Sequence, residues 1–214
     1  MSGPGPLGVL GGTFDPVHAG HLALAREARQ QLELECVILM PAGAPWQRQA
    51  EASAQDRLAM VHLAAATEPG LAVDDREIRR AGPTYTIDTV RELRAEWGDE
   101  RPLWVILGAD AFLHLHTWHR WQELLAQTHL AVFCRPGAPL EAEAIPLPLR
   151  PACEARRCAP AAAKGAAGSI AFCRMPMLDV SATGIRAALR SGRPAADLLP
   201  RPVLDYIETH QLYR

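Results

Sequence analysis

The chain has 214 residues, with 22 Lys and Arg against 24 Asp and Glu, a formal net charge of −2 when its 8 His are counted as neutral. This length predicts one domain with an appendage, and so balanced a charge argues against a protein that holds nucleic acid or a membrane by bulk electrostatics. Lys164 is the only lysine, and its alanine-rich surroundings exclude a P-loop, which needs Gly-Lys-Ser/Thr between a strand and a helix.

The cysteines and the N-terminus bear on the compartment. Five scattered cysteines without Cys-x-x-Cys spacing do not predict a disulfide framework and fit a reducing compartment better. Residues 1–6 carry no basic stretch, and the apolar run that follows is broken by glycines, so neither a signal peptide nor a membrane span is expected. We expect a cytoplasmic protein whose partners are neither membrane nor nucleic acid. The sequence does not decide the oligomeric state, and a homo-oligomer is one alternative.

Short apolar runs alternate with segments of helical spacing along the first half of the chain. In order, the pattern predicts a strand at 7–10, a helix at 21–32, a strand at 36–40, a helix at 55–66, a strand at 71–73 and a helix with Thr86 as its N-cap.

The second half continues the alternation. It predicts strands at 103–107, 129–133 and 170–175, a helix from Ser181 to Arg190, and a terminal helix that begins at Pro202. Residues 136–169 are rich in Pro, Ala and Gly without periodicity, so we expect a long, partly irregular connection, or a solvated helix in its alanine-rich part. The whole pattern predicts an α/β fold: a doubly wound, mostly parallel sheet in a single domain over 1–214, with C-terminal helices at 181–214.

The turn after the first strand is where such sheets bind ligands. It reads Gly11-Gly12-Thr13-Phe14-Asp15-Pro16-Val17-His18-Ala19-Gly20-His21. The glycine intervals are not those of the dinucleotide fingerprint, which disfavours a nicotinamide oxidoreductase. His18 and His21 share one face at the positive end of a helix, and Gly12 and Gly20 allow close backbone approach, so we interpret the turn as a phosphate site. The alternative is that one histidine caps the helix and the other packs under it.

A second helix start has a similar character. The segment from Asp179 to Arg186 places the hydroxyl of Ser181 as an N-cap and sets Thr183 and Arg186 on one face. It is either a second phosphate site or an ordinary capped helix.

Both segments resemble the nucleotidylyltransferase superfamily, the first through Gly-Thr-Phe-Asp-Pro-Val-His-x-Gly-His and the second through Ile-Ser-Ser/Ala-Thr-x-x-Arg. The resemblance implies that two helix N-termini converge on the triphosphate of ATP. It implies catalytic roles for His18, His21 and Arg186, and ATP contacts from Gly11, Gly12, Thr13, Phe14, Gly20, Gly108, Asp110, Ser181 and Thr183. Without the resemblance, Asp110 could equally cap the helix after its strand.

Further segments look like the bacterial nicotinate-mononucleotide adenylyltransferases. They are residues 82–89, 106–110, 117–121, 134–137, 198–207 and 212–214. The likeness implies that Trp118 stacks on the pyridine ring, that Thr86 and the backbone N–H of His119 recognise the nicotinate carboxylate, and that Arg135 holds the acceptor phosphate. The alternative for Trp118 is a core pair with Trp121.

One segment departs from that family. After the second strand the family shows Pro-Asn/Ala-x-x-Pro-Pro-His-Lys/Arg, whereas Gln47 stands here in place of the histidine. An amide donates hydrogen bonds but carries no charge. Arg48 is the candidate for the missing cation, and Trp46 suggests a lid of different shape.

The resemblance implies an enzyme that transfers the adenylyl group of ATP to the 5′-phosphate of nicotinate mononucleotide, giving deamido-NAD and pyrophosphate. Mg²⁺ is expected to arrive with ATP, and no protein metal site is expected, because His114, His116 and His119 lack a Cys or carboxylate at ligand spacing. The alternative acceptors are nicotinamide mononucleotide, a phosphopantetheine-type substrate or, with CTP, glycerol phosphate. From another class, the alternative is a nucleotide sensor without turnover.

Overall fold

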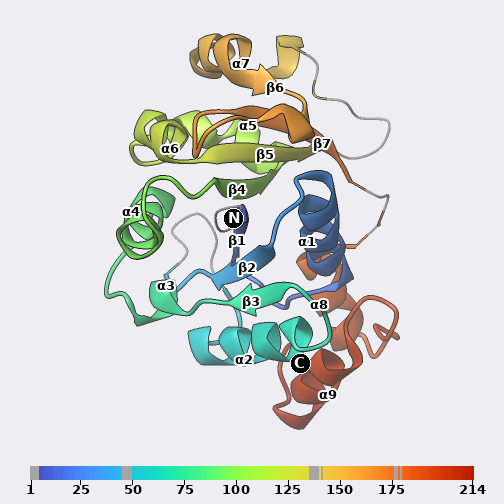
Figure 1. The fold of residues 1–214 in the computed structure, drawn as a ribbon. Helices are drawn as coiled ribbons and strands as arrows, with labels where there is room; N and C mark the ends of the chain where they lie inside the picture. The colour runs from blue at the N-terminus through green and yellow to red at the C-terminus, as the bar shows by residue number, and fades with distance from the viewer. Residues whose placement is uncertain (1–4, 45–49, 135–139, 141, 176–177, 179) are drawn as a thin grey trace.

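A parallel sheet forms the centre of the structure (Figure 1), a computed structural model that describes residues 5–44, 50–134, 140, 142–175, 178 and 180–214. Within these residues seven strands pair in the order β3-β2-β1-β4-β5-β7-β6, and every pair is parallel. The strands are β1 (Leu7–Gly12), β2 (Cys36–Pro41), β3 (Leu71–Val73), β4 (Leu103–Gly108), β5 (His129–Cys134), β6 (Arg157–Cys158) and β7 (Ile170–Arg174).

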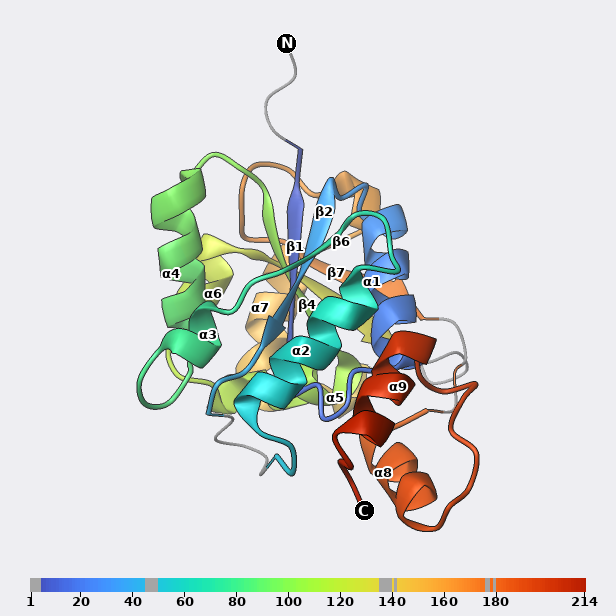
Figure 2. The same cartoon turned by 90° about the horizontal axis from the view of Figure 1, so that it is seen from below.

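Helices cover both faces of this sheet. They are α1 (Ala19–Gln31), α2 (Ala54–Ala65), α3 (Arg76–Arg79), α4 (Thr86–Trp97), α5 (Ala109–Leu113), α6 (Trp121–Gln127), α7 (Arg150–Arg156), α8 (Ala182–Arg190) and α9 (Arg201–Thr209), with 3-10 turns at Leu115–Thr117, Ala142–Ala144, Leu147–Leu149 and Pro160–Ala162. Helices α1, α2, α8 and α9 bury their apolar sides against one face, and α4 to α7 against the other (Figure 2). Among the described helices, none has the length and apolar character that a membrane crossing needs.

The central strands are apolar on both sides because both faces are covered. In β1, Val9 belongs to the core under α4 and α6, while the next residue, Leu10, belongs to the core under α1 and α9. Successive side chains of a strand point to opposite faces, so a strand buried on both sides needs a continuous apolar run. This confirms the predicted strands and the doubly wound parallel architecture.

One detail of the predicted elements was wrong: Tyr85 is the N-cap of α4, and Thr86 is its first helical residue. Residues 136–169 also contain two short elements that the pattern did not predict, α7 and β6, and α7 ends before the alanine-rich tract. The physical reason is local: Leu149 and Cys153, four residues apart, are buried against the edge of the sheet and hold one helical turn there.

The sheet opens between β1 and β4, where the strand order reverses. β1 pairs with β2 as far as Gly12, and β4 pairs with β5 as far as Gly108. Between themselves, however, β1 and β4 pair over Leu7–Val9 and Leu103–Val105. The carboxyl ends of the two strands therefore leave the ladder facing each other, which is where a ligand binds in a sheet of this kind.

Candidate active site

His18 and His21 meet at the start of α1. His18 is the N-cap, with extended backbone, and its own N–H donates to Nδ1 of His21 over 3.2 Å. The two rings stack with centroids 3.8 Å apart. Because Nδ1 of His21 accepts this hydrogen bond, a neutral His21 carries its proton on Nε2, which is then a donor. The two histidines thus lie on one face, as their spacing predicts.

The ring of His18 is in an unusual electrostatic environment. It is 7% exposed, and burial lowers its pKa to about 4, so the ring is neutral at pH 7. Its Nδ1 is buried and has no hydrogen-bond partner among the described residues. A buried ring nitrogen without a partner costs stability, and at this edge of the sheet a phosphate oxygen would supply the missing partner.

The start of α8 lies against the start of α1. A methyl group placed on Gly20 would come within 2.7 Å of Cγ1 of Val180, the residue before the N-cap of α8. That N-cap is Ser181, whose Oγ accepts the N–H of Gly184 at 3.1 Å, and Thr183 is exposed in the first turn. The structure therefore brings the two predicted phosphate-binding helix starts together.

Arg186 reaches from α8 to the turn that follows β1, which we call the glycine turn (residues 11–17). Its Nη1 donates to the carbonyl oxygen of Asp15 at 2.8 Å, and its Nε donates to Oε1 of Glu51 at 2.7 Å. Glu51 also pairs with Arg190, one helical turn further along α8. The guanidinium is thus held at the edge of the sheet by two segments that are remote in the sequence.

A buried arginine supports the glycine turn from below. Arg57 of α2 is 1% exposed; its Nη1 donates to the carbonyl oxygen of Thr13 at 2.7 Å and its Nη2 to that of Gly43 at 3.3 Å. Burial lowers the pKa of this group. Sequence reasoning missed Arg57, although a signal exists: it lies three and four residues before Met60 and Val61, on the buried face of α2.

Open space lies beside the carboxyl ends of β1 and β4. A Cβ atom on Gly11 or on Gly108 would meet nothing within 4 Å in the described structure, so a ligand has room to approach either backbone. Asp110 lies exposed in the first turn of α5, and because Gly108 is the N-cap there, Asp110 does not cap that helix. Phe14 closes the other side, buried with its ring 4.9 Å from that of His21.

The segments that carry the predicted acceptor residues Thr86 and His119 are in contact. Thr86 begins α4, and the ring of its neighbour Tyr85 lies 4.6 Å from that of His119. Trp118 is partly buried against the core under α4 and α6, and its Nε1 is buried with no partner in the part of the chain that the structure describes. Arg135, Trp46, Gln47 and Arg48 lie outside the described residues.

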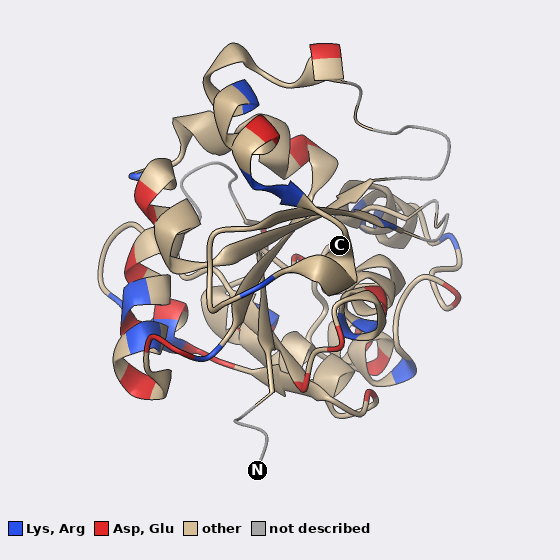
Figure 3. Cartoon of the chain, turned by 45° about the horizontal axis from the view of Figure 1, so that its top comes forward, with Lys and Arg blue, Asp and Glu red and all other residues tan. Residues whose placement is uncertain are grey.

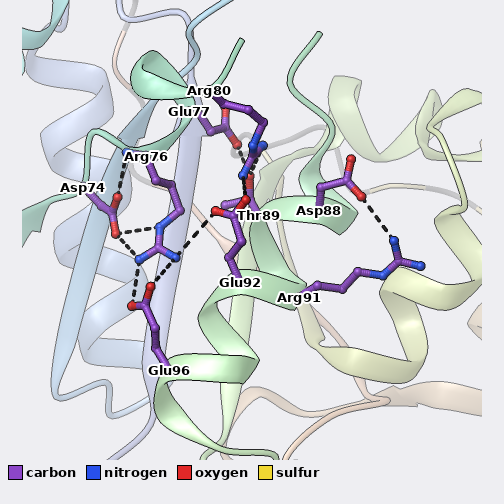
Figure 4. Close-up of polar contacts among 9 residues, drawn as sticks. All are labelled: Asp74, Arg76, Glu77, Arg80, Asp88, Thr89, Arg91, Glu92 and Glu96. Carbon is purple, nitrogen blue, oxygen red and sulfur yellow. Dashed lines mark hydrogen bonds and ion pairs between the residues drawn. The ribbon is translucent and has the colours of Figure 1, made fainter. Parts of the chain in front are cut away.

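Polar contacts between α3 and α4 fix the stretch that leads to Thr86 (Figure 4). Thr89 donates its hydroxyl to Oε1 of Glu77 at 2.7 Å and accepts from Nη1 of Arg80 at 3.0 Å. Burial raises the pKa of Glu77. Arg76 joins Asp74 to Glu96 nearby, so α3 is held firmly against α4.

The chain is similar over nearly its whole length to known proteins. Residues 9–188 match the cytidylyltransferase-like family. A protein of Pseudomonas entomophila (strain L48) named probable nicotinate-nucleotide adenylyltransferase is 49% identical over 210 residues, 97% of this chain and 94% of that protein. One of the same name from Chromobacterium violaceum is 45% identical, over 97% of this chain and 98% of that protein. This chain belongs to the nicotinate-nucleotide adenylyltransferase family.

Solved structures share the fold of this adenylyltransferase. The nicotinic acid mononucleotide adenylyltransferase of Plasmodium falciparum, solved in complex with NaAD, superposes with a TM-score of 0.75 at 14% identity, covering 98% of this chain and 97% of that one. A protein of Vibrio parahaemolyticus named putative nicotinate-nucleotide adenylyltransferase superposes with a TM-score of 0.65 at 14% identity, over 98% of this chain and 96% of that one. The resemblance drawn from the sequence and the predicted fold class are confirmed.

Proposed function

We propose that this chain transfers the adenylyl group of ATP to the 5′-phosphate of nicotinate mononucleotide, releasing pyrophosphate and forming deamido-NAD. The observation that carries the proposal is the meeting of two helix N-termini, with His18, His21 and Arg186, beside the opening between β1 and β4. The names of its relatives support the same reaction.

The reaction needs positioning more than it needs a base. An oxygen of the acceptor phosphate attacks the α-phosphorus of ATP in line; the new P–O bond forms as the bond between the α-phosphorus and the bridging oxygen breaks, and pyrophosphate leaves with the electron pair. A phosphate monoester is already an anion near neutral pH, so no group must remove a proton from it. Catalysis then comes from alignment and from stabilising charge on the phosphate oxygens.

Five side chains supply that stabilisation in our proposal. His18 and His21 donate to oxygens of the α- and β-phosphates, and Arg186, with Ser181 and Thr183, holds the β- and γ-phosphates. A triphosphate beside His18 would satisfy its buried Nδ1 and raise its pKa from about 4, because an anion favours the protonated ring. The ATP backbone contacts fall to Gly11, Gly12, Gly20 and Gly108, and the ribose contact to Asp110.

The acceptor side favours an acid over an amide. The hydroxyl of Thr86 and the N–H of His119 both donate, and Thr86 stands at the N-terminus of a 12-residue helix, whose dipole favours negative charge. A carboxylate accepts from two donors, whereas a carboxamide presents its own N–H groups to one of them. We assign Trp118 to the pyridine ring and Arg135 to the acceptor phosphate.

Mg²⁺ would enter this site with ATP. Within the described residues no three His, Cys, Asp or Glu side chains gather as a metal site. Mg²⁺ prefers phosphate oxygens and water as ligands, so the triphosphate would hold it. When bound, Mg²⁺ supplies positive charge to the triphosphate. The five free thiols fit a reducing compartment, and we propose the cytoplasm.

The role of His21 can be tested by substitution. We expect His21→Ala to lower kcat/KM by about 100-fold, because a donor to the transition state is lost while the helix remains. Pyrophosphate release with ATP and nicotinate mononucleotide is the measurement, and circular dichroism checks the fold. His62→Ala, an exposed change on α2, is the control and should match the unaltered protein. Near-normal turnover in His21→Ala would remove this residue from the mechanism.

A further inference from the structure

The next-to-last residue of the chain lies beneath the glycine turn. Tyr213 is 7% exposed, and its hydroxyl donates to Oδ1 of Asp15 at 2.7 Å, although 198 residues separate the two. Burial and the neighbouring carboxylate raise the pKa of Tyr213, so the hydroxyl keeps its proton and remains a donor. The C-terminus is therefore bonded directly to the turn that follows β1.

Asp15 joins three segments through one carboxylate. It is 4% exposed; its Oδ2 accepts the backbone N–H of Glu51 at 2.7 Å, and its Oδ1 accepts that of Ala52 at 3.1 Å in addition to the hydroxyl of Tyr213. A buried carboxylate depends on such donors, since each one lost leaves charge uncompensated. The buried carboxylate of Asp15 thus connects the glycine turn to the stretch before α2 and to the C-terminal segment.

The same carboxylate fixes Arg186. The backbone carbonyl of Asp15 and the side chain of Glu51 accept from Nη1 and Nε of its guanidinium. The Asp15 carboxylate fixes the position of both acceptors. Its hydrogen bonds immobilise residue 15, which carries the accepting carbonyl, and one of them, from the backbone N–H of Glu51, immobilises residue 51. Two bonds to a planar group define its orientation, and a guanidinium has five N–H donors, so others are left for phosphate.

We propose that Tyr213 is a positioning residue for the triphosphate of ATP, acting through Asp15 to set the orientation of Arg186. The proposal rests on the function proposed above, in which Arg186 binds the β- and γ-phosphates. Tyr213 itself touches no substrate. Its hydroxyl keeps the Asp15 carboxylate in the one position that supports both contacts to the guanidinium.

The test removes a single hydroxyl. Tyr213→Phe keeps the ring and its packing, and we expect the Kd for ATP, measured by isothermal titration calorimetry, and the KM for ATP to rise by about 5- to 10-fold. The KM for nicotinate mononucleotide should stay the same, since the acceptor residues belong to other elements. The matched control is Tyr206→Phe, whose hydroxyl donates to Oδ1 of Asp56 at 3.0 Å between α9 and α2, and both constants should be unchanged there.

A double-mutant cycle separates positioning from stability. If Tyr213 acts through Arg186, Tyr213→Phe has no further effect on kcat/KM for ATP in an Arg186→Ala background. An equal loss in both backgrounds, or an unchanged Kd in Tyr213→Phe, would contradict the proposal. So would a titration whose stoichiometry falls while Kd stays constant, because that result means fewer folded molecules with an intact site.

The two proposals can fail separately. ATP titration needs no acceptor, so it measures the Tyr213 contact whatever the acceptor is. Suppose that the protein binds ATP, that Tyr213→Phe lowers its affinity for ATP, and that it releases no pyrophosphate with nicotinate mononucleotide. This result would contradict the proposed function and support the positioning role.

Discussion

The ring of His18 stacks on the ring of His21 and lies beside Gly20, at the positive end of α1. Both burial and the helix dipole oppose a positive charge there. The protein therefore keeps a neutral imidazole at the place where we propose that a phosphate binds, and Nδ1 of this ring has no hydrogen-bond partner among the described residues. This resembles other preorganised anion sites, in which the polar groups are desolvated before the ligand arrives.

The low pKa of His18 makes stability depend on pH. The folded-state pKa of about 4 lies below the ordinary 6.5, so the unfolded chain binds the proton more readily, and stability falls as pH drops from 6.5 towards 4. This group should cost about 2 kcal/mol of unfolding free energy between pH 7 and pH 5. His18→Gln, followed by urea unfolding at both pH values, should make the decline shallower by that amount. Equal declines would mean that folding does not lower the pKa of His18.

Single side chains were predictable where their partners are near in sequence. His18 and His21 are three residues apart on a helix, so their shared face follows from helix geometry. The bonds of Arg186 to Asp15 and Glu51 span 171 and 135 residues, and nothing local in the sequence indicates them. The same holds for the hydroxyl of Tyr213.

The contact between α1 and α8 depends on Gly20, because this residue has no Cβ atom. Gly20, inside the first turn of α1, lies against Val180 and the His18 ring, where a Cβ would stand at 2.7 and 3.1 Å. In an open helix, replacing Gly by Ala stabilises by about 1 kcal/mol. Here the contact between α1 and α8 should reverse that sign.

We expect Gly20→Ala to lower the unfolding free energy by about 1–3 kcal/mol, as overpacking does, and to raise the KM for ATP by about 10-fold, since it displaces α8. Adding Val180→Ala removes the clashing methyl groups, so the double variant should recover much of the lost unfolding free energy and much of the affinity for ATP. Chemical denaturation and ATP-dependent kinetics measure the effects. A stabilised Gly20→Ala protein with unchanged KM would show that the helix starts do not touch.

Another buried arginine lies at the opposite end of the sheet, where the strands begin. Arg94 of α4 donates to the carbonyl oxygens of Arg101, Gln127 and Ala166 at 2.6 to 3.0 Å, which precede β4, β5 and β7. It thus joins the amino ends of three strands, far from the opening between β1 and β4.

Arg94→Met should lower the unfolding free energy by about 3 kcal/mol or more, because several buried carbonyls lose their donor. Both KM values should be unchanged in the folded protein. Arg91→Met on the same helix is the control, because Arg91 makes partly exposed ion pairs with Asp88 and Glu123, which are worth at most about 1 kcal/mol. Equal losses in the two variants would contradict the bridging role of Arg94.

The molecule as a whole is close to neutral, and acidic and basic residues occur side by side on its helices (Figure 3). In the function that we propose, two phosphorylated substrates are therefore held by local groups: helix starts, His18 and His21, and the arginines Arg135 and Arg186. Lys164, the only lysine, is exposed in the alanine-rich tract. Phosphate sites of this local kind are compatible with a nearly neutral chain, because they do not need a basic surface.

The architecture was more predictable than the connections. Each buried strand is a continuous apolar run between glycine, proline or polar residues, which indicates a covered parallel sheet without any knowledge of strand order. The helix α7 inside residues 136–169 was not predictable, because seven residues are too few to establish a helical period and the helix is anchored by the tertiary contacts of Leu149, Ala152 and Cys153. Tertiary contact decides such a segment.

Pyrophosphate release from ATP, measured with a panel of phosphorylated acceptors, is the decisive experiment for the whole account. The panel is nicotinate mononucleotide, nicotinamide mononucleotide, a phosphopantetheine-type acceptor and, with CTP, glycerol phosphate. We predict release with nicotinate mononucleotide at a kcat/KM roughly 10-fold or more above that with the amide, because the site offers donors to a carboxylate. Binding of ATP without release in any mixture, or a preference for the amide, would contradict the account.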